Sequence, residues 1–360
     1  MIGKTWLRSR WPGKSAWLIS PPDWFSGPEQ LRALAARLIG VETESVALIP
    51  SASYGIAIAA ANVKVEPGQS IVLLDEQFPS NVYAWQILAK QHDATIRTVQ
   101  RDPSGTWTQA VLEAIEPDTA VVAVSNCHWT DGSLIDLVEV SARARSMGAA
   151  LVIDASQSLG AYPIDMARVQ PDFLVSVGYK WLLGPYGLGY FYAAPGWCET
   201  GRPLENSWLS RAGSEDFVRL VDYEAAYRAG ARRFDMGEFS QFVLVPMAAA
   251  ALSRLLDWGI ETIQASLAVL SGDIEQRALQ LGGSALPAGQ RVDHMIGIRL
   301  PGGLPAELSQ RLAAENIFVS IRGDSIRVAP HVYNDPADVE RFFAGIYFDN
   351  VRLLRQVKIV

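Results

Sequence analysis

Short apolar runs alternate with amphipathic stretches over the first two-thirds of the chain. Near-continuous runs of Val, Ala, Ile and Leu predict strands that are buried on both faces of a sheet. The run at 120–124 is of this kind, and the candidate strands lie at 46–49, 71–74, 95–99, 120–124, 150–153, 173–177 and 189–192. Apolar residues at helical spacing between several of the runs predict helices at 54–62, 80–91, 108–115 and 137–147. The alternation predicts an α/β fold with a mostly parallel, doubly wound sheet.

Further helices are predicted on either side of this series. The pattern favours one helix over 28–38, which begins at a proline and is ended by Gly40. Residues 195–234 are irregular and rich in Gly and Arg, so we interpret them as loop and interface material. Two long helices are then expected over 241–258 and 261–281.

The last third of the chain has a different pattern, which predicts a smaller α/β domain. Its expected elements are a strand, a helix, two more strands and a final helix, at 294–300, 305–315, 318–321, 325–328 and from 336 onward. Asp335 before Pro336 suits a helix start. The Asp carboxylate can cap the helix, and proline, which has no amide hydrogen, loses no hydrogen bond in the first turn. We expect a large domain over 21–258 and a small domain formed by 1–20 and 259–360.

Composition narrows the class of protein. A chain of 360 residues that is 49% hydrophobic is neither disordered nor a disulfide-stapled miniprotein, and its length predicts about two domains. The net charge of −7 argues against nucleic acid as the main partner. Two cysteines exclude a Cys-rich zinc site, and no pair among the four histidines has metal-ligand spacing, so we expect no metal.

The chain shows no targeting or membrane signal. No apolar run approaches the ~18 residues that a membrane span needs. The basic segment 1–22 lacks the apolar block of a signal peptide, and we interpret it as a solvated or partner-facing arm. We therefore expect a soluble, cytoplasmic protein.

The most informative residues are an acid and a lysine that follow two predicted strands. Asp154 ends the strand at 150–153, and Lys180 follows the strand at 173–177. Ligands of open α/β sheets bind beyond the carboxyl ends of the strands, so both side chains should reach one crevice. A desolvated lysine is a neutral amine that can form a Schiff base with an aldehyde, and a carboxylate can pair with a protonated pyridine nitrogen. These are the two protein groups that pyridoxal phosphate requires. Taken singly, such an acid is usually a turn former and such a lysine a surface charge.

With these motifs the sequence resembles the class V aminotransferases, a family of fold type I pyridoxal phosphate enzymes. The family includes cysteine desulfurases, kynureninases and isopenicillin N epimerase-like proteins, and the resemblance covers roughly residues 49–333. It implies that Lys180 forms the internal aldimine and that Asp154 bonds the pyridinium nitrogen. By the same resemblance, Gln157 contacts the phenolic oxygen of the cofactor. Because fold type I sites are usually shared across a two-fold axis, it also implies a homodimer.

Three other segments fit the resemblance. Residues 51–55 follow a strand and begin a helix, where free amides favour a phosphate, so Ser53 and Tyr54 are phosphate candidates; a serine there is otherwise a helix cap. Phe78 resembles the kynureninase phenylalanine that stacks on the cofactor ring, although packing in the core is the plain alternative. Tyr179 matches the kynureninase tyrosine that reaches the phosphate.

The substrate side of the site is expected around Arg327. An arginine in an apolar strand is costly unless it is paired, and the family uses an arginine here for the substrate α-carboxylate. A structural ion pair is the alternative role, and Arg322 is a weaker candidate for a second substrate group. Asn126, His128 and Trp129 follow the strand at 120–124 and should contact the substrate or the cofactor edge. Considered alone, His128 is more often a packed, hydrogen-bonded residue.

Two departures from the family pattern matter. Residues 318–327 contain no cysteine, and Cys127 lies at a strand end, so we do not expect a desulfurase that works through a protein persulfide. In the segment that resembles the family's cross-subunit phosphate motif, Gly237 is followed by Glu238 where the family has Thr. A carboxylate would repel the phosphate, which puts that contact in doubt.

The sequence thus predicts a pyridoxal phosphate enzyme that acts on an α-amino acid. We rank aminotransferase first on the family's usual activity. A lyase or kynureninase-type hydrolase, an epimerase or racemase, and a catalytically inactive binding or regulatory protein are the alternatives. A nucleotide-binding α/β protein is disfavoured, because the chain has neither Gly-rich phosphate motif in the required place.

Overall fold

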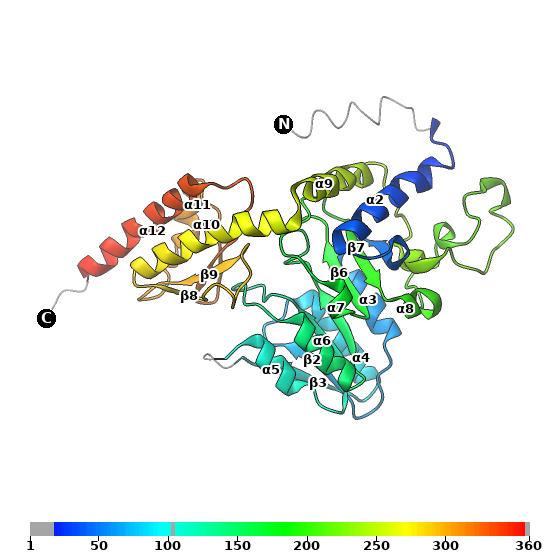
Figure 1. Cartoon of the computed structure of the whole chain (residues 1–360), viewed down its shortest axis with the longest axis horizontal. Coiled ribbons are helices and arrows are strands. Elements are labelled where there is room, and N and C mark those ends of the chain that lie inside the picture. The colour runs from blue at the N-terminus through cyan, green and yellow to red at the C-terminus, as the bar shows by residue number, and fades with distance from the viewer. Residues whose placement is uncertain (1–17, 102–104, 357–360) are drawn as a thin grey trace.

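The computed structural model describes residues 18–101 and 105–356 and contains two β-sheets. Figure 1 shows the larger sheet with its helices on one side of the molecule and the smaller sheet with α10, α11 and α12 on the other. The predicted N-terminal arm lies outside the described residues for positions 1–17.

The large sheet has seven strands in the order β1-β7-β6-β5-β4-β2-β3. Neighbouring pairs from β3 to β6 are parallel, and β7 is antiparallel to both of its neighbours. The mostly parallel, doubly wound sheet predicted from the apolar runs is therefore confirmed. Its strands are β1 (Val46–Ile49), β2 (Ser70–Leu74), β3 (Thr95–Val99), β4 (Thr119–Ser125), β5 (Ala150–Asp154), β6 (Phe173–Val177) and β7 (Gly189–Ala193).

Helices cover both faces of this sheet, because its strands are apolar on both sides. One face packs against α2 (Asp23–Ile39), α5 (Trp107–Ala114), α6 (Leu137–Ser146), α7 (Met166–Val169) and α9 (Leu244–Trp258). The other face packs against α3 (Ala52–Asn62), α4 (Tyr83–Gln91) and α8 (Pro195–Thr200). The helices α7 and α8, of four and six residues, are too short to give a periodic pattern and were not predicted.

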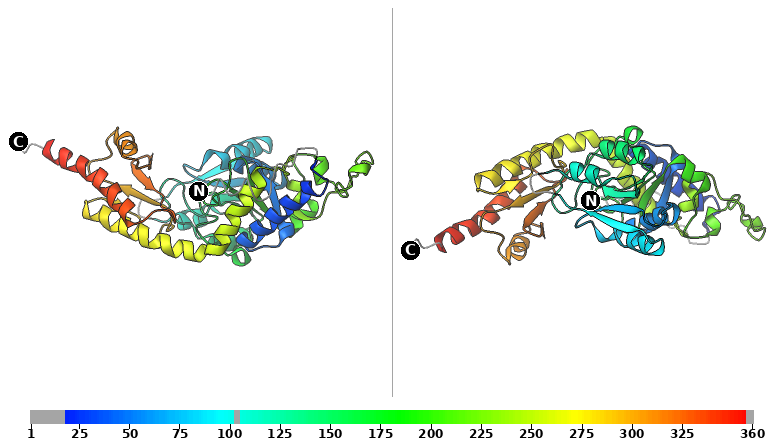
Figure 2. Two further views of the ribbon diagram at one scale, coloured as in Figure 1. Left: turned by 90° about the horizontal axis from the view of Figure 1, so that it is seen from above. Right: turned by 90° about the horizontal axis from the view of Figure 1, so that it is seen from below.

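The smaller sheet is antiparallel and has the order β10-β11-β9-β8. Its elements are β8 (Ser284–Ala285), β9 (Ile296–Arg299), α11 (Leu308–Ala314), β10 (Ser320–Arg322), β11 (Ser325–Val328) and α12 (Pro336–Gln356). The long helix α10 (Ile260–Gln280) joins the two parts: Ile263 and Leu267 lie in the core of the large sheet, whereas Ile274 and Ala278 lie in the core of the small one. Figure 2 shows α10 running along the molecule from one part to the other. We propose that the domains divide near residue 259.

The first helix begins earlier than predicted. It starts at Asp23, so Pro28 lies inside it rather than at its start. Proline has no amide hydrogen and leaves the carbonyl four residues earlier, that of Trp24, without its helical partner. Ser240 donates its hydroxyl to this carbonyl at 2.5 Å and replaces the missing bond. The sequence around Pro28 does not predict this hydrogen bond, because Ser240 is 216 residues away from Trp24.

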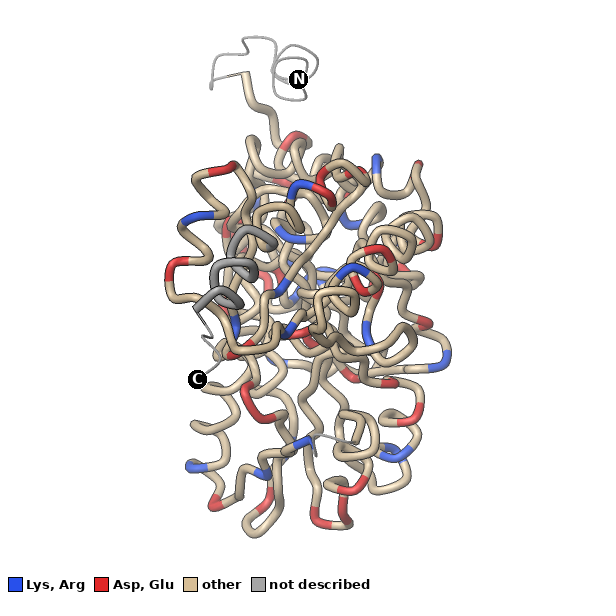
Figure 3. The backbone as a smooth tube through the Cα atoms, turned by 90° about the vertical axis from the view of Figure 1, so that its left-hand side faces the viewer, with Lys and Arg blue, Asp and Glu red and all other residues tan. Residues whose placement is uncertain are grey.

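Acidic and basic positions are interspersed along the side of the molecule shown in Figure 3. Within the described residues, none of the helices combines the length and the apolar character that crossing a bilayer requires.

A cluster of ion pairs joins α2 to the segment that precedes α9. Arg32 is fully buried and binds both carboxylate oxygens of Asp235, at 3.0 and 2.7 Å. Glu29, one turn earlier on α2, binds Arg232 at 2.6 Å and Arg228 at 3.4 Å. Burial alone would raise the pKa of Glu29, but the hydrogen bond from Arg232 and the three nearby guanidinium charges outweigh it and lower that pKa to about 2.

This lowered pKa predicts a loss of stability in acid. A carboxylate whose pKa is lower in the folded than in the unfolded chain stabilises the fold above its ordinary pKa of 4.5, and that stability is lost as the pH falls toward 2. Glu29 is partly open to solvent, so we expect it to contribute about 1–2 kcal/mol. The free energy of unfolding, measured by urea titration between about pH 6 and about pH 3, should therefore fall less steeply in Glu29→Gln than in the unaltered protein. Equal slopes would contradict the assignment.

Candidate active site

A cavity of about 260 Å³ opens at the carboxyl ends of the parallel strands. It approaches the ~300 Å³ at which ligand pockets begin. Its walls come from the turn between β1 and α3 and from the segments that follow β2, β4, β5 and β6. The lining residues are Pro50, Ser51, Ala52, Ser53, Gln77, Phe78, Ser80, Ser125, Cys127, Trp129, Asp154, Ser156, Gln157, Val177, Tyr179, Lys180 and Tyr186.

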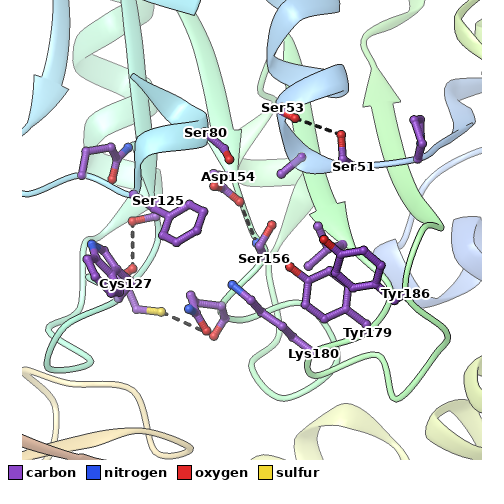
Figure 4. A pocket seen from close by; sticks show the side chains of 17 residues that line it. Ser51, Ser53, Ser80, Ser125, Cys127, Asp154, Ser156, Tyr179, Lys180 and Tyr186 are labelled. Atoms are coloured by element: carbon purple, nitrogen blue, oxygen red, sulfur yellow. Dashed lines mark hydrogen bonds between the residues drawn. The ribbon is translucent and has the colours of Figure 1, made fainter. Parts of the chain in front are cut away.

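Lys180 and Asp154 line this same cavity, as their positions after β6 and β5 predict. The chain turns tightly before the lysine: a Cβ atom on Gly178 would lie 2.6 Å from the carbonyl oxygen of Leu188. Burial lowers the pKa of Lys180, the charge of Asp154 opposes that shift, and the charge of Arg327 adds to it. A buried amine with a lowered pKa is the more readily neutral and nucleophilic. Figure 4 shows Lys180, Asp154 and Cys127 facing the same space.

The last residue of β5 and the segment after it supply three polar groups. Asp154 is 7% exposed and accepts a hydrogen bond from the backbone amide of Ser156 at 3.0 Å. The buried hydroxyl of Ser156 has no hydrogen-bond partner among the described residues. The side-chain oxygen of Gln157 accepts from the indole of Trp181 at 3.3 Å, and its backbone carbonyl is 2.6 Å from Nε2 of His294. An unpaired hydroxyl beside a buried carboxylate is available to a ligand.

The N-terminus of α3 faces the cavity with two serines. Ser51, rather than Ser53, is the helix cap, and its hydroxyl accepts from the amide of Tyr54 at 3.2 Å. The exposed Ser53 hydroxyl lies 2.9 Å from that of Ser51 and is open to the cavity. The side chain of Tyr54 does not line the cavity; burial and the nearby Glu205 carboxylate raise the pKa of its hydroxyl. Of the two phosphate candidates, only Ser53 reaches the cavity with its side chain.

Aromatic rings form another part of the wall. The Phe78 ring centroid is 5.2 Å from the Lys180 amine and packs edge-on against Trp129 at 5.6 Å. Tyr179 packs against Tyr186, with ring centroids 4.6 Å apart. Phe78 is 38% exposed, so it is a wall of the site and not a core residue.

Asn126 and His128 are not in the cavity wall. Both are 2% exposed. The His128 nitrogens lie 2.7 Å from the Thr130 hydroxyl and 3.1 Å from the Asp75 carbonyl, and its ring stacks on Trp107 at 4.8 Å. Burial lowers its pKa, which favours the neutral ring. His128 therefore occupies the packed, hydrogen-bonded role that a lone histidine usually has, while the buried amide of Asn126 finds no partner among the described residues.

Arg327 approaches the cavity from the small sheet. It lies on β11 and donates from Nη1 to the backbone carbonyl of Trp129 at 2.6 Å, with its guanidinium carbon 5.9 Å from the Trp129 ring centroid. No carboxylate binds it in the part of the chain that the structure describes. It is thus held beside the site with its charge unpaired, which does not match the structural ion pair considered as its alternative role.

Two features bear on the departures from the family pattern. Cys127 is fully buried in the cavity wall, and burial raises the pKa of its thiol. A neutral thiol at a buried strand end is a poor nucleophile. Glu238 is exposed, and the preceding Gly237 donates its backbone amide to Glu205 at 2.5 Å.

The sequence prediction placed Trp129 at the crevice, where it lies, but missed several other lining residues, of which Ser156 matters most. Ser156 follows Asp154 by two residues, and its place after a strand that ends in an acid was the available signal. Tyr186 lies in the glycine-rich loop after Lys180, and only the folded loop brings it against Tyr179.

The sequence matches one protein-family profile over most of its length and has relatives among known proteins. A profile of the family described as Aminotransferase class-V matches residues 25–343. An uncharacterized aminotransferase, YcbU from Bacillus subtilis (strain 168), is 28% identical over 300 residues, covering 83% of this chain and 77% of that protein. Isopenicillin N epimerase from Streptomyces clavuligerus is 30% identical over 184 residues, covering 50% of this chain and 46% of the epimerase.

A solved structure shares the fold. The complex of the cystine C-S lyase C-DES with its reaction product cysteine persulfide superposes with a TM-score of 0.81 at 20% identity, covering 95% of this chain and 90% of the lyase. The two named relatives are thus an uncharacterized aminotransferase and an epimerase, and the protein that shares the fold is a lyase.

Proposed function

The chain belongs to the class V aminotransferase family, whose members depend on pyridoxal phosphate, and from this premise we propose that it is an aminotransferase of an α-amino acid with the cofactor bound to Lys180. The observation that carries the proposal is that Lys180 and Asp154 line one cavity at the ends of adjacent strands. An amine and a carboxylate that face one small cavity can act on opposite parts of the same small molecule.

The lining residues fit a phosphorylated pyridine aldehyde. Lys180 would attach to the aldehyde, and Asp154 would hold the protonated ring nitrogen. The N-terminus of α3, with the free Ser53 hydroxyl, offers donors and a positive dipole end to the phosphate. The unpaired hydroxyl of Ser156 would gain a partner, and Phe78 would give the ring an aromatic neighbour.

When bound, the cofactor supplies an electron sink for the carbanion that forms at the substrate α-carbon. The chain's own groups do the remaining work. Asp154 keeps the ring nitrogen protonated, and Arg327 holds the substrate carboxylate in a bidentate pair and so fixes the orientation of the α-carbon. The amine of Lys180 would move the α-proton as general base and acid.

Enzymes with these residues can catalyse several different reactions. The relative YcbU, matched over most of this chain, supports transamination as the first choice. Epimerisation, and elimination or hydrolysis of a side-chain group, use the same machinery and are the alternatives. The buried, neutral Cys127 does not support a reaction through a protein persulfide. The joint presence of Lys180, Asp154 and Arg327 in one region disfavours an inactive binding protein.

A panel of amino acids incubated with the cofactor-loaded protein separates these reactions. We expect keto acid to form only when a second keto acid is present as amino acceptor. Ammonia released without an acceptor would instead assign a lyase or hydrolase, and a change of enantiomer without keto acid would assign an epimerase. If the loaded protein turned over no amino acid at all, the enzymatic proposal would be wrong.

We further propose that the protein is a cytoplasmic homodimer. The resemblance to fold type I enzymes supports the dimer, because their sites are usually completed across a two-fold axis.

A further inference from the structure

The hairpin of β10 and β11 carries two arginines on one face. Its register pairs Ser320 with Arg327 and Arg322 with Ser325, with the pair Ile321 and Ile326 between them. Since side chains alternate along a strand, Arg322 and Arg327 point to the same side, opposite the fully buried Ile326. They are diagonal neighbours, which places their backbones ~7–8 Å apart.

Both guanidinium groups converge on Trp129. The Arg322 and Arg327 guanidinium carbons lie 5.2 and 5.9 Å from the centroid of its ring. Arg327 donates to the carbonyl of Trp129, and Arg322 donates to its own neighbour, the carbonyl of Ile321, at 2.8 Å. Trp129 itself lines the cavity that holds Lys180. The two cations therefore share one approach to the candidate active site.

Arg322 and Arg327 have no carboxylate partner among the described residues, unlike Arg299 and Arg291 nearby. Within the described residues, neither has a carboxylate within ion-pair distance, and the buried Nε of Arg322 has no hydrogen-bond partner. By contrast, Arg299 on the adjacent strand β9 binds Asp324 at 3.0 Å, and the buried Arg291 binds Glu275 at 2.8 Å. Burial lowers the pKa of Arg327, and the charge of Arg322 lowers it further. Two neighbouring cations with unused donors form an arrangement that an anionic ligand would stabilise.

One carboxylate is satisfied by one bidentate arginine, so two arginines on one face suit two anionic groups. We propose that Arg322 binds an anionic group on the substrate side chain while Arg327 binds the α-carboxylate, so that the substrate is an acidic α-amino acid. The inference rests on the proposed function, in which Arg327 takes the α-carboxylate. The anion is a carboxylate, a sulfinate or a phosphate, since the same guanidinium donors bind each of them.

The proposal is tested by measuring how tightly the cofactor-loaded protein binds acidic amino acids and their neutral amides. Each amino acid is titrated into the protein, and its dissociation constant is obtained from the change in visible absorbance. The constant for L-aspartate is compared with that for L-asparagine, and the constant for L-glutamate with that for L-glutamine. We expect the charged member of at least one pair to bind about tenfold or more tightly. Cysteine sulfinate and O-phosphoserine, run beside these, tell which anion the site prefers. Equal binding within both pairs, together with no gain for the sulfinate or the phosphate, would overturn the proposal.

Variants assign the preference to Arg322. Arg322→Gln should reduce the charged-to-neutral ratio to near one, and Arg322→Lys should retain part of it, because a charge remains without the bidentate geometry. Arg299→Gln, which removes a surface arginine of the same sheet, should leave the ratio unaltered. An unaltered ratio in Arg322→Gln would also overturn the proposal, and a matching thermal unfolding midpoint shows that the variant is folded. If amino acids of both kinds bind equally, only this inference fails; if the loaded protein binds no amino acid, the proposed function fails with it.

Discussion

Lys180→Ala is expected to abolish covalent attachment of pyridoxal phosphate and to lower the rate of amino-acid turnover by at least about 10³-fold. The reason is that Lys180 has two proposed tasks, to hold the cofactor and to move the α-proton, and alanine performs neither. The measurement is the visible spectrum of the purified protein before and after borohydride, followed by mass spectrometry of the reduced chain. In the unaltered protein, reduction should fix the cofactor to a peptide that contains residue 180.

Lys90 provides the matched control. It is an exposed lysine on α4, so Lys90→Ala should leave both the spectrum and the turnover rate unaltered. Cofactor fixed by borohydride in Lys180→Ala would move the attachment to another residue. A colourless protein that pyridoxal phosphate cannot reconstitute would end the assignment of the whole site.

Asp235→Ala is expected to lower the free energy of unfolding by about 3–5 kcal/mol. It would take from the guanidinium of Arg32, which is 0% exposed, its buried carboxylate partner and leave only Glu29, at 3.4 Å from Nε. It would also remove the acceptor of the Leu48 amide, which Asp235 binds at 2.7 Å and which lies on strand β1. Because native stability is typically about 5–15 kcal/mol, the loss should be a large share of the total. Urea titration followed by circular dichroism gives the value.

An exposed ion pair serves as the control for the buried pair of Asp235 and Arg32. Asp222 binds Arg219 at 3.1 Å, with both side chains largely in solvent. Asp222→Ala should therefore cost less than about 1 kcal/mol. If Asp235→Ala cost no more than Asp222→Ala, the buried pair would not stabilise the fold in the way that its geometry indicates.

Most strands of the large sheet could be predicted closely because burial on both faces demands nearly uninterrupted apolar residues; the edge strand β3, with Thr95 and Thr98 exposed, lacks that pattern. Strands β1, β3 and β6 have the predicted bounds, β2, β5 and β7 differ by one residue at one end, and β4 is longer by one residue at each end. The short β8, of two residues, carries no comparable pattern and was missed. Helix α2 was misplaced at its start, since a proline in a helix is tolerated only if a distant group replaces its hydrogen bond, as Ser240 does.

The sequence by itself determined the α/β class and the positions of Lys180 and Asp154 after two strands. Local periodicity fixes those features, and parallel strands bring their carboxyl ends to one edge. Only the tertiary structure decided that Tyr54 turns toward Glu205, that His128 is held by Thr130 and the Asp75 carbonyl, and that Arg322 joins Arg327 at Trp129. Each of these depends on a partner far away in the chain or on the direction in which a side chain leaves a turn. Neither the spacing of residues nor their periodicity specifies such contacts.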